Sequence, residues 1–182
     1  MNIWHDMREE RITPESFIAV IEISKGSKKK YELDKETGLL ILDRILYTST
    51  HYPANYGFIP RTYAKDLDPL DVLVLCSEEL EPLSMVRCYP VGVIRMIDEE
   101  QEDHKIIAIP FDDPNWNYYH ELIELPPHLS QEVEHFFQVY KNLEHKETTG
   151  FEVLGRKEAL RIIEESIVSY QNVFVKNQKN GK

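Results

Sequence analysis

The sequence has few cysteines, no long apolar run and no excess of positive charge. Its 182 residues include two cysteines, Cys76 and Cys88, which allow one disulfide at most and fit a reducing compartment. The segment from Met1 to Glu10 is polar and lacks the apolar centre of a signal peptide, and no apolar run reaches the length of a membrane span. We therefore expect a cytoplasmic protein with no membrane partner.

The acidic balance of the chain limits its partners. A net charge of −11 argues against nucleic acid as the main partner, because nucleic acids are bound by a basic face. A small anionic substrate is still compatible with this charge, because local cations or metal ions can reverse the local field. Apolar residues make up 42% of the chain and charged residues 29%, which is typical of a soluble globular protein.

The order of the expected elements indicates an α+β fold. Strands are predicted at residues 17–23, 30–33, 39–42, 72–75, 86–97, 103–109 and 151–154, with a bend or bulge at Gly92. Two helices are predicted, one capped by Ser130 and one over residues 156–171. We expect one domain over residues 1–182, with a polar arm at 1–16, a frayed tail at 176–182, and both helices packed on a small closed antiparallel β-barrel.

The most informative stretch is residues 65–75, where three aspartates precede an apolar strand. Asp66, Asp68 and Asp71 lie within six residues, and Pro69 makes the segment between them a turn. Carboxylates held together repel one another, and hard cations such as Mg²⁺ and Mn²⁺ prefer such oxygen ligands. A solvated acidic turn is the alternative interpretation. An EF-hand is excluded, because the glycine at its sixth position and the glutamate at its twelfth are absent.

Carboxylates and cations share strand faces elsewhere in the chain. Lys30 and Glu32 are two residues apart and project together, as do Asp103 and Lys105. Surface ion pairs are the alternative interpretation of such sets. Glu22 shares its strand face with two apolar residues, which is unusual for a carboxylate without a role. The aromatic segment 52–60 predicts a loop that lines a pocket or caps the core. Many carboxylates together with several cations would be balanced by divalent metals and an anionic substrate.

At these motifs the chain resembles the soluble inorganic pyrophosphatases that have an oligonucleotide-binding-type (OB-like) barrel. The resemblance covers about residues 17–171. It rests on Ile21-Glu22-Ile23, Lys30-Tyr31-Glu32, Asp43-Arg44, Tyr52-Pro53-x-Asn55-Tyr56-Gly57, Asp66-x-Asp68-Pro69-x-Asp71-Val72, Pro90-Val91-Gly92-Val93, the segment 98–105, and His135-Phe136-Phe137-x-x-Tyr140-Lys141. It implies hydrolysis of pyrophosphate to two orthophosphates by direct in-line attack of a metal-activated water.

The resemblance also implies the cofactors and a role for each site residue. Several Mg²⁺ ions would bind per site, Mn²⁺ or Zn²⁺ would substitute, and Ca²⁺ would inhibit. The implied metal ligands are Asp66, Asp71, Asp98, Asp103 and Glu32. The implied substrate ligands are Lys30, Arg44, Tyr56, Lys105, Tyr140 and Lys141. Asp68 would be the general base, and Tyr56 would lie close to the nucleophile. Glu22 would lie near the metal ligands without binding a metal ion itself.

Two positions depart from the family pattern, and three other functions compete with the one implied. Leu67 stands where the family usually has a small or polar residue, often glycine, and Arg156 stands where many bacterial members have tryptophan. In length the chain resembles the compact bacterial form of the family, and this resemblance implies a homo-hexamer. The competing functions are a module that binds single strands, an inactive metal-binding protein, and a hydrolase for another phosphoanhydride.

Overall fold

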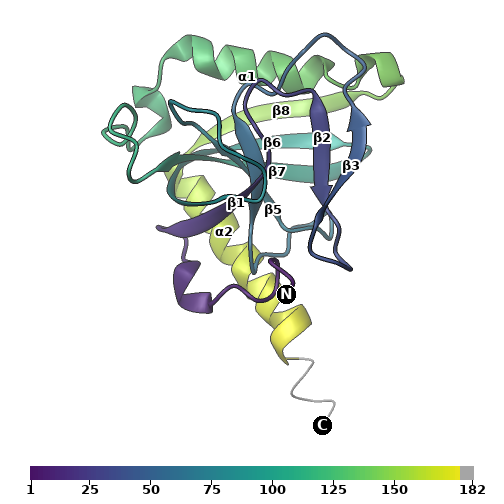
Figure 1. Ribbon diagram of the computed structural model, residues 1–182. Helices are drawn as coiled ribbons and strands as arrows, with labels where there is room; N and C mark the ends of the chain where they lie inside the picture. Colours follow the sequence, from purple (N-terminus) through teal and green to yellow (C-terminus); the bar gives the residue numbers. More distant parts are fainter. Residues whose placement is uncertain (177–182) are drawn as a thin grey trace.

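Most of the predicted strands form, and the computed structural model, which describes residues 1–176, places them in one mixed sheet and one separate hairpin (Figure 1). The strands are β1 (Phe17–Ile23), β2 (Lys29–Leu33), β3 (Leu40–Ile45), β4 (Asn55–Ile59), β5 (Leu70–Val74), β6 (Met85–Asp98), β7 (Gln101–Pro110) and β8 (Thr148–Gly155). The helices are α1 (Pro127–Val139) and α2 (Arg156–Tyr170), with short helical turns η1 (Glu9–Arg11), η2 (Leu122–Glu124), η3 (Asn142–Glu144) and η4 (Gln171–Lys176).

The main sheet has the strand order β1-β4-β5-β7-β6-β8, and β1 also pairs with β6. The β2–β3 hairpin stands apart as a two-stranded sheet. The expectation of a purely antiparallel sheet is wrong, because β5 and β7 pair in parallel. The long strand β6 lies between them in the sequence and runs antiparallel to β7, so it carries the chain back before β7 begins. The bulge expected at Gly92 is confirmed by a register shift between Pro90 and Gly92.

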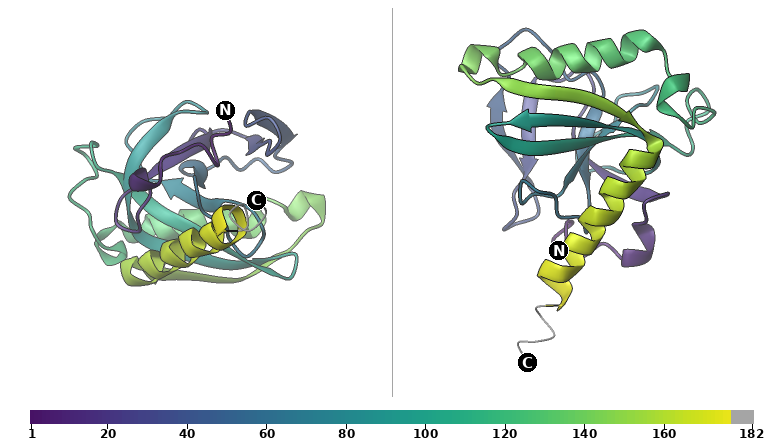
Figure 2. Two further views of the ribbon diagram at one scale, coloured as in Figure 1. Left: turned by 90° about the horizontal axis from the view of Figure 1, so that it is seen from below. Right: turned by 180° about the vertical axis from the view of Figure 1, so that it is seen from behind.

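The two helices cover opposite faces of the strands β5, β6 and β7 (Figure 2). Alternate side chains of a strand point to opposite faces, so each of these strands contributes to two apolar clusters. The cluster beneath α1 includes Leu73, Ile94, Ile107, Val133, Phe136 and Phe137. The cluster beneath α2 includes Val72, Val93, Ile106, Ala159, Ile162 and Ile163. The two helices predicted from the sequence are therefore confirmed, each with one apolar face on the sheet.

The aromatic segment 52–60 is not a loop throughout, because Asn55–Ile59 forms the fully buried strand β4. Gly57 explains the difference. A Cβ atom at this position would lie 1.8 Å from the carbonyl oxygen of Val20 on β1, so only glycine lets the two strands approach so closely. Gly57 therefore serves the pairing of β1 with β4.

The first long helix begins earlier than predicted. It starts at Pro127, with Pro126 as the N-cap residue, so Ser130 lies inside the helix and does not cap it. Proline is favoured at the first helical position, because its fixed φ suits the helix and the N–H that it lacks would have no partner there.

The polar N-terminal arm is anchored by buried apolar side chains. Trp4, Met7 and Ile12 are each buried, although the segment around them is mostly polar. Cys76 and Cys88 are both free thiols. Within residues 1–176, no helix is long and apolar enough to cross a bilayer. The frayed tail expected at 176–182 lies outside the described residues, except for Lys176 at the end of η4.

Candidate active site

A cleft of about 290 Å³ brings together residues from six separate parts of the chain. It lies among β1, the β2–β3 hairpin, the segment on and before β4, the loop that leads into β5, the β6–β7 hairpin and the C-terminal end of α1. Of the predicted site residues, those that line it are Glu22, Lys30, Glu32, Tyr56, Asp66, Asp68, Asp71, Asp98, Asp103, Lys105, Tyr140 and Lys141. The remaining one, Arg44, lies outside the lining residues of the described chain.

The parallel pairing of β5 and β7 creates the centre of the cleft. Their register sets Asp71 beside Lys105. Asp103 lies two residues before Lys105 on β7 and therefore projects from the same face. Tyr56 reaches the same point from β4, which pairs with β5 on its other side. The sequence predicted that Asp103 and Lys105 would project together, and the contacts between them confirm it.

The ammonium group of Lys105 is the main positive charge at this centre. Its Nζ donates to the hydroxyl of Tyr56 at 2.9 Å, to Oδ2 of Asp71 at 2.8 Å and to Oδ2 of Asp103 at 3.1 Å. Only 3% of Lys105 is exposed. Burial by itself disfavours the charged amine, but the carboxylates of Asp103 and Asp71 outweigh it and raise the pKa of Lys105 well above its ordinary value. The lysine is therefore charged at neutral pH.

Burial raises the pKa of three carboxyl groups in the cleft, those of Glu22, Asp66 and Asp103. Burial, and after it repulsion from Asp71, raises the pKa of Glu22 to about 8. Its Oε1 accepts a hydrogen bond from the backbone N–H of Leu33 at 2.8 Å. Burial, followed by repulsion from Asp71 and Asp103, raises the pKa of Asp66 to about 7. The cleft therefore has more carboxylates than its own cations can neutralise.

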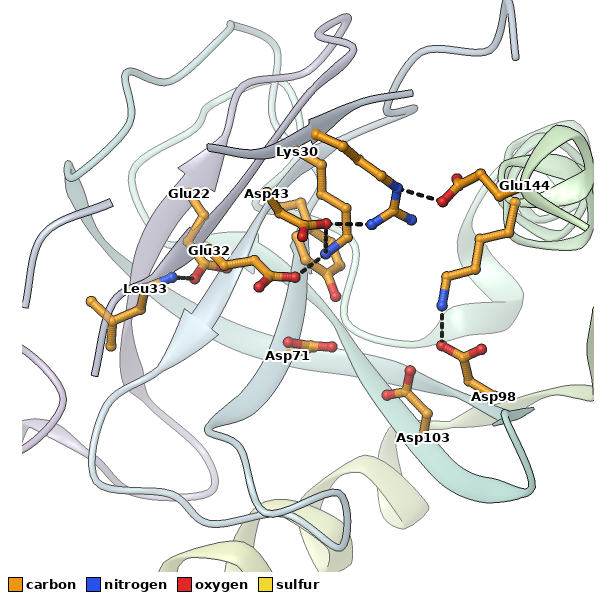
Figure 3. A network of polar contacts seen from close by, with 12 residues as sticks. Glu22, Lys30, Glu32, Leu33, Asp43, Asp71, Asp98, Asp103 and Glu144 are labelled. Carbon is orange, nitrogen blue, oxygen red and sulfur yellow. Dashed lines mark hydrogen bonds and ion pairs between the residues drawn. The ribbon is translucent and has the colours of Figure 1, made fainter. Parts of the chain in front are cut away.

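Each predicted phosphate-binding lysine or arginine is paired with a carboxylate. The pairs around the rim are Lys30 with Glu32 and Asp43, Arg44 with Asp43 and Glu144, and Lys141 with Asp98 (Figure 3). Arg44 Nε lies 2.7 Å from Oε1 of Glu144, and this contact joins β3 to the turn that follows α1. Figure 3 shows the carboxylates of Asp71, Asp98 and Asp103 lying toward one another on one side of the cleft.

A family model for inorganic pyrophosphatase matches residues 19–171 of this chain. The chain belongs to the inorganic pyrophosphatase family. It is 46% identical over 172 residues to soluble inorganic pyrophosphatase 2 of Chlamydomonas reinhardtii, covering 94% of this chain and 90% of that protein.

Solved structures of bacterial pyrophosphatases share the fold. The enzyme of Helicobacter pylori has a TM-score of 0.84 and 43% identity, covering 87% of this chain and 95% of the other. The enzyme of Thermus thermophilus has a TM-score of 0.89 and 36% identity, covering 94% and 99%. The resemblance inferred from the motifs is thus confirmed at the level of the family.

Inorganic pyrophosphatases are generally metal-dependent, and the donor set of this cleft fits a hard cation. Its carboxylates are crowded, Asp66 and Glu22 have raised pKa values, and Oδ1 of Asp98 is buried without a hydrogen-bond partner among the described residues. Within residues 1–176, however, no three histidine, cysteine, aspartate or glutamate side chains have the arrangement of a metal site. Lys105 explains this, because its ammonium group lies between Asp71 and Asp103.

Two charged residues of this pyrophosphatase family member lie at or beside the cleft although no motif predicted them. Lys35, at the tip of the β2–β3 hairpin, lines the cleft and forms an ion pair with Asp68. Glu144 is largely buried and pairs with Arg44. Neither residue lies within a strand or an α-helix, so no alternation of apolar and polar positions pointed to it. The signal that could have found them was a charged side chain close in sequence to a predicted site residue: Lys35 lies three residues after Glu32, and Glu144 lies three residues after Lys141.

The two departures from the family pattern have local consequences. Leu67 has φ 68°, in the left-handed region that favours glycine, and its side chain is exposed. A leucine there costs about 1 kcal/mol of backbone strain. Arg156 donates from Nε to the carbonyl oxygen of Pro90 at 3.2 Å, at the start of α2.

Proposed function

We propose that this chain hydrolyses inorganic pyrophosphate to two orthophosphates in the cleft, by in-line attack of water and with Mg²⁺ as cofactor. The observation that carries the proposal is the convergence of five aspartates with Lys30, Lys105 and Lys141 in one cavity of about 290 Å³. Family membership supports pyrophosphate as the substrate. The cations suit its phosphate oxygens, and the surplus of carboxylates suits the divalent ions that accompany it.

The ligands proposed for Mg²⁺ are Asp66, Asp71, Asp98, Asp103 and Glu32. Bound Mg²⁺ would offset the repulsion among these carboxylates and lower the pKa of a bound water. Mn²⁺ or Zn²⁺ is expected to substitute. Ca²⁺ is expected to bind and inhibit, because its coordination is looser and positions the water poorly.

Asp68 is the proposed general base. It lies on the loop before β5, lines the cleft and is about half exposed, so it can accept a proton from the attacking water and release it to solvent. Tyr56 is held by its contact with Lys105, and burial, followed by the charge of Asp71, raises its pKa well above the ordinary value. It therefore stays a hydroxyl that can donate to substrate near the nucleophile.

The remaining cations are proposed to bind the two phosphates. Lys30, Lys105 and Lys141 line the cleft and can exchange a carboxylate partner for a phosphate oxygen. Tyr140 is buried beside them, and burial raises its pKa, so it remains a donor. Arg44 is proposed to contribute from the rim, where Asp43 and Glu144 orient its guanidinium group.

We also propose the larger features that the family resemblance implies. Residues 1–182 would form one domain, and the pairing of β1 with both β4 and β6 supports a closed OB-like barrel. The protein would be a cytoplasmic homo-hexamer. Exposed apolar side chains on and beside β3, namely Leu39, Ile41, Ile45 and Tyr47, support burial in an oligomer. Sedimentation equilibrium at several protein concentrations measures the assembly directly, and a monomer at all of them would contradict it.

Phosphate release from pyrophosphate tests the proposed activity. It should be fast with Mg²⁺, absent with EDTA and inhibited by added Ca²⁺, while ATP offered at the same concentration should be a poor substrate. Comparable release from ATP would favour a hydrolase of another phosphoanhydride. No release from a folded protein would contradict the proposal, and Leu67 would be the first residue to replace.

A further inference from the structure

The N-terminal arm contacts the hairpin tip that carries Lys35. The side-chain amide of Asn2 donates to the carbonyl oxygen of Lys35 at 2.9 Å. The backbone of Met1 and Asn2 lies so close to Gly38 that a Cβ atom there would meet it at 3.0 to 3.2 Å. The ammonium group of Lys35 lies 6.0 Å from the centroid of the Trp4 ring. The arm therefore packs against both the backbone and the side chain of Lys35.

The same arm also holds the loop that carries Asp66 and Asp68. Trp4 donates from Nε1 to the carbonyl oxygen of Thr62 at 2.9 Å and accepts at its own carbonyl from the N–H of Arg61 at 3.0 Å. The hydroxyl of Thr62 in turn accepts from the N–H of Leu70 at 2.8 Å. Trp4 thus fixes the beginning of the loop, and Thr62 connects that point to the first residue of β5.

Aromatic packing makes the arm a rigid support. Only 4% of Trp4 is exposed. Its ring lies 5.2 Å from that of Phe174 and 6.2 Å from that of Tyr63, measured between centroids. The neighbouring His5 ring contacts the hydroxyl of Tyr170 at 2.9 Å. Figure 2 shows the N-terminal segment beside the C-terminal end of α2. The arm is therefore anchored on the helix while it contacts both walls of the cleft.

An ion pair completes the connection inside the cleft. Lys35 and Asp68 both line it, and their charged ends pair, with side-chain exposures of 51% and 48%. Such half-exposed pairs usually contribute little, because two long side chains must be ordered to form them. Here the arm already orders Lys35, so a smaller entropy loss opposes the pair.

We propose that Lys35 is a positioning residue for the carboxylate of Asp68, and that residues 1–4 hold Lys35 in place for this role. The proposal rests on the function proposed above for Asp68. The N-terminal arm lies before the segment that the family model matches. In this proposal the arm helps to set the position of a side chain in the site. Lys35 acts through Asp68 and not as a ligand of the substrate.

The first test is the steady-state kinetics of Lys35→Met with pyrophosphate and Mg²⁺. We expect kcat to fall about fivefold, which corresponds to about 1 kcal/mol, with KM changed less than about twofold. Lys35→Arg should restore kcat, because it keeps the charge. The matched control is Lys65→Met, which removes an exposed lysine from the loop that carries Asp68. The ion-pair partner of Lys65 is Glu102, which does not line the cleft.

The second test is a double-mutant cycle between Trp4→Leu and Lys35→Met. If the arm acts partly through Lys35, Trp4→Leu lowers kcat more in the wild type than in the Lys35→Met background, where only the contact of Trp4 with Thr62 is left to lose. Additive effects would overturn the role of the arm. A rise in KM for Lys35→Met with kcat unchanged would make Lys35 a substrate ligand and overturn its positioning role.

Hydrogen exchange separates this inference from the proposed function. In the unliganded protein, Lys35→Met should speed exchange of the amides in residues 64–70, whereas Lys65→Met should not. Equal exchange in Lys35→Met and the wild type would overturn positioning, whatever the activity. If the wild type releases no phosphate but the exchange result holds, the proposed function fails while the structural link stands. If the wild type is active and Lys35→Met matches it in both assays, only the inference fails.

Discussion

Replacing Glu22 with glutamine should change the pH dependence of stability. Glu22 is 7% exposed, and its Oε1 accepts from the N–H of Leu33 at 2.8 Å. Glutamine keeps the size and the acceptor oxygen but has no proton to lose. Burial and then the charge of Asp71 raise the pKa of Glu22 to about 8, compared with an ordinary value of 4.5. The variant therefore isolates the cost of ionising this buried carboxyl.

The direction and size of the change in folding stability with pH follow from the pKa values of Glu22 in the folded and the unfolded chain. Between pH 4.5 and about 8 the unfolded chain loses the Glu22 proton while the folded chain keeps it, so ionisation stabilises only the unfolded state. The stability that Glu22 provides is complete below pH 4.5 and is lost as pH rises to about 8. A difference of about 3.5 pH units at about 1.4 kcal/mol per unit gives a loss of about 5 kcal/mol.

Urea unfolding in EDTA, from about pH 5 to about pH 8, measures this loss. Relative to the wild type, Glu22→Gln should gain stability steadily, by about 1 kcal/mol near pH 5 and up to about 5 kcal/mol near pH 8. Glu15→Gln, at an exposed position, is the matched control and should follow the wild type. Parallel pH curves for Glu22→Gln and the wild type would refute the reasoning, because the carboxyl would then ionise equally easily in both states.

Three further substitutions test the site and the fold. Asp68→Asn should lower kcat about a hundredfold or more, while the rise in melting temperature caused by Mg²⁺ stays unchanged; a normal kcat would remove Asp68 from the role of base. Lys105→Met should reduce the free energy of unfolding in EDTA by about 3 to 5 kcal/mol, because Asp71 and Asp103 lose their buried cation, and wild-type stability would contradict that account. Gly57→Ala should prevent folding or destabilise the protein by more than about 3 kcal/mol, since its Cβ would lie 1.8 Å from the carbonyl oxygen of Val20. Gly155→Ala, whose Cβ would meet nothing within 4 Å, should unfold in urea like the wild type.

Regular local patterns explain what could be predicted from the sequence. The apolar run 17–23 became β1 with the predicted bounds. The two-residue spacing of Asp103 and Lys105 placed them on one strand face, because this alternation is a property of any extended chain. The family followed from motifs in order along most of the chain, and the match over residues 19–171 agrees with it.

The errors arose where distant parts of the chain decided the local structure. The segment 55–59 is a strand because β1 approaches Gly57 closely, and no pattern within the segment records that approach. The parallel pairing of β5 and β7 depends on the path of β6 between them. Lys35 and Glu144 reach the site from a hairpin tip and a helix end, where neither has periodic neighbours.

The sequence by itself determined which charges the protein carries, which of them share a strand face, and which family the chain belongs to. These follow from composition, from the period of the backbone and from the order of motifs. Only the tertiary structure decided that Lys105 lies between Asp71 and Asp103, that Glu22 keeps its proton near neutral pH, and that the arm at residues 1–4 meets Lys35. The physical reason is that cross-strand register and burial set the distances and the dielectric surroundings of charges, and both arise from contacts between residues far apart in the chain.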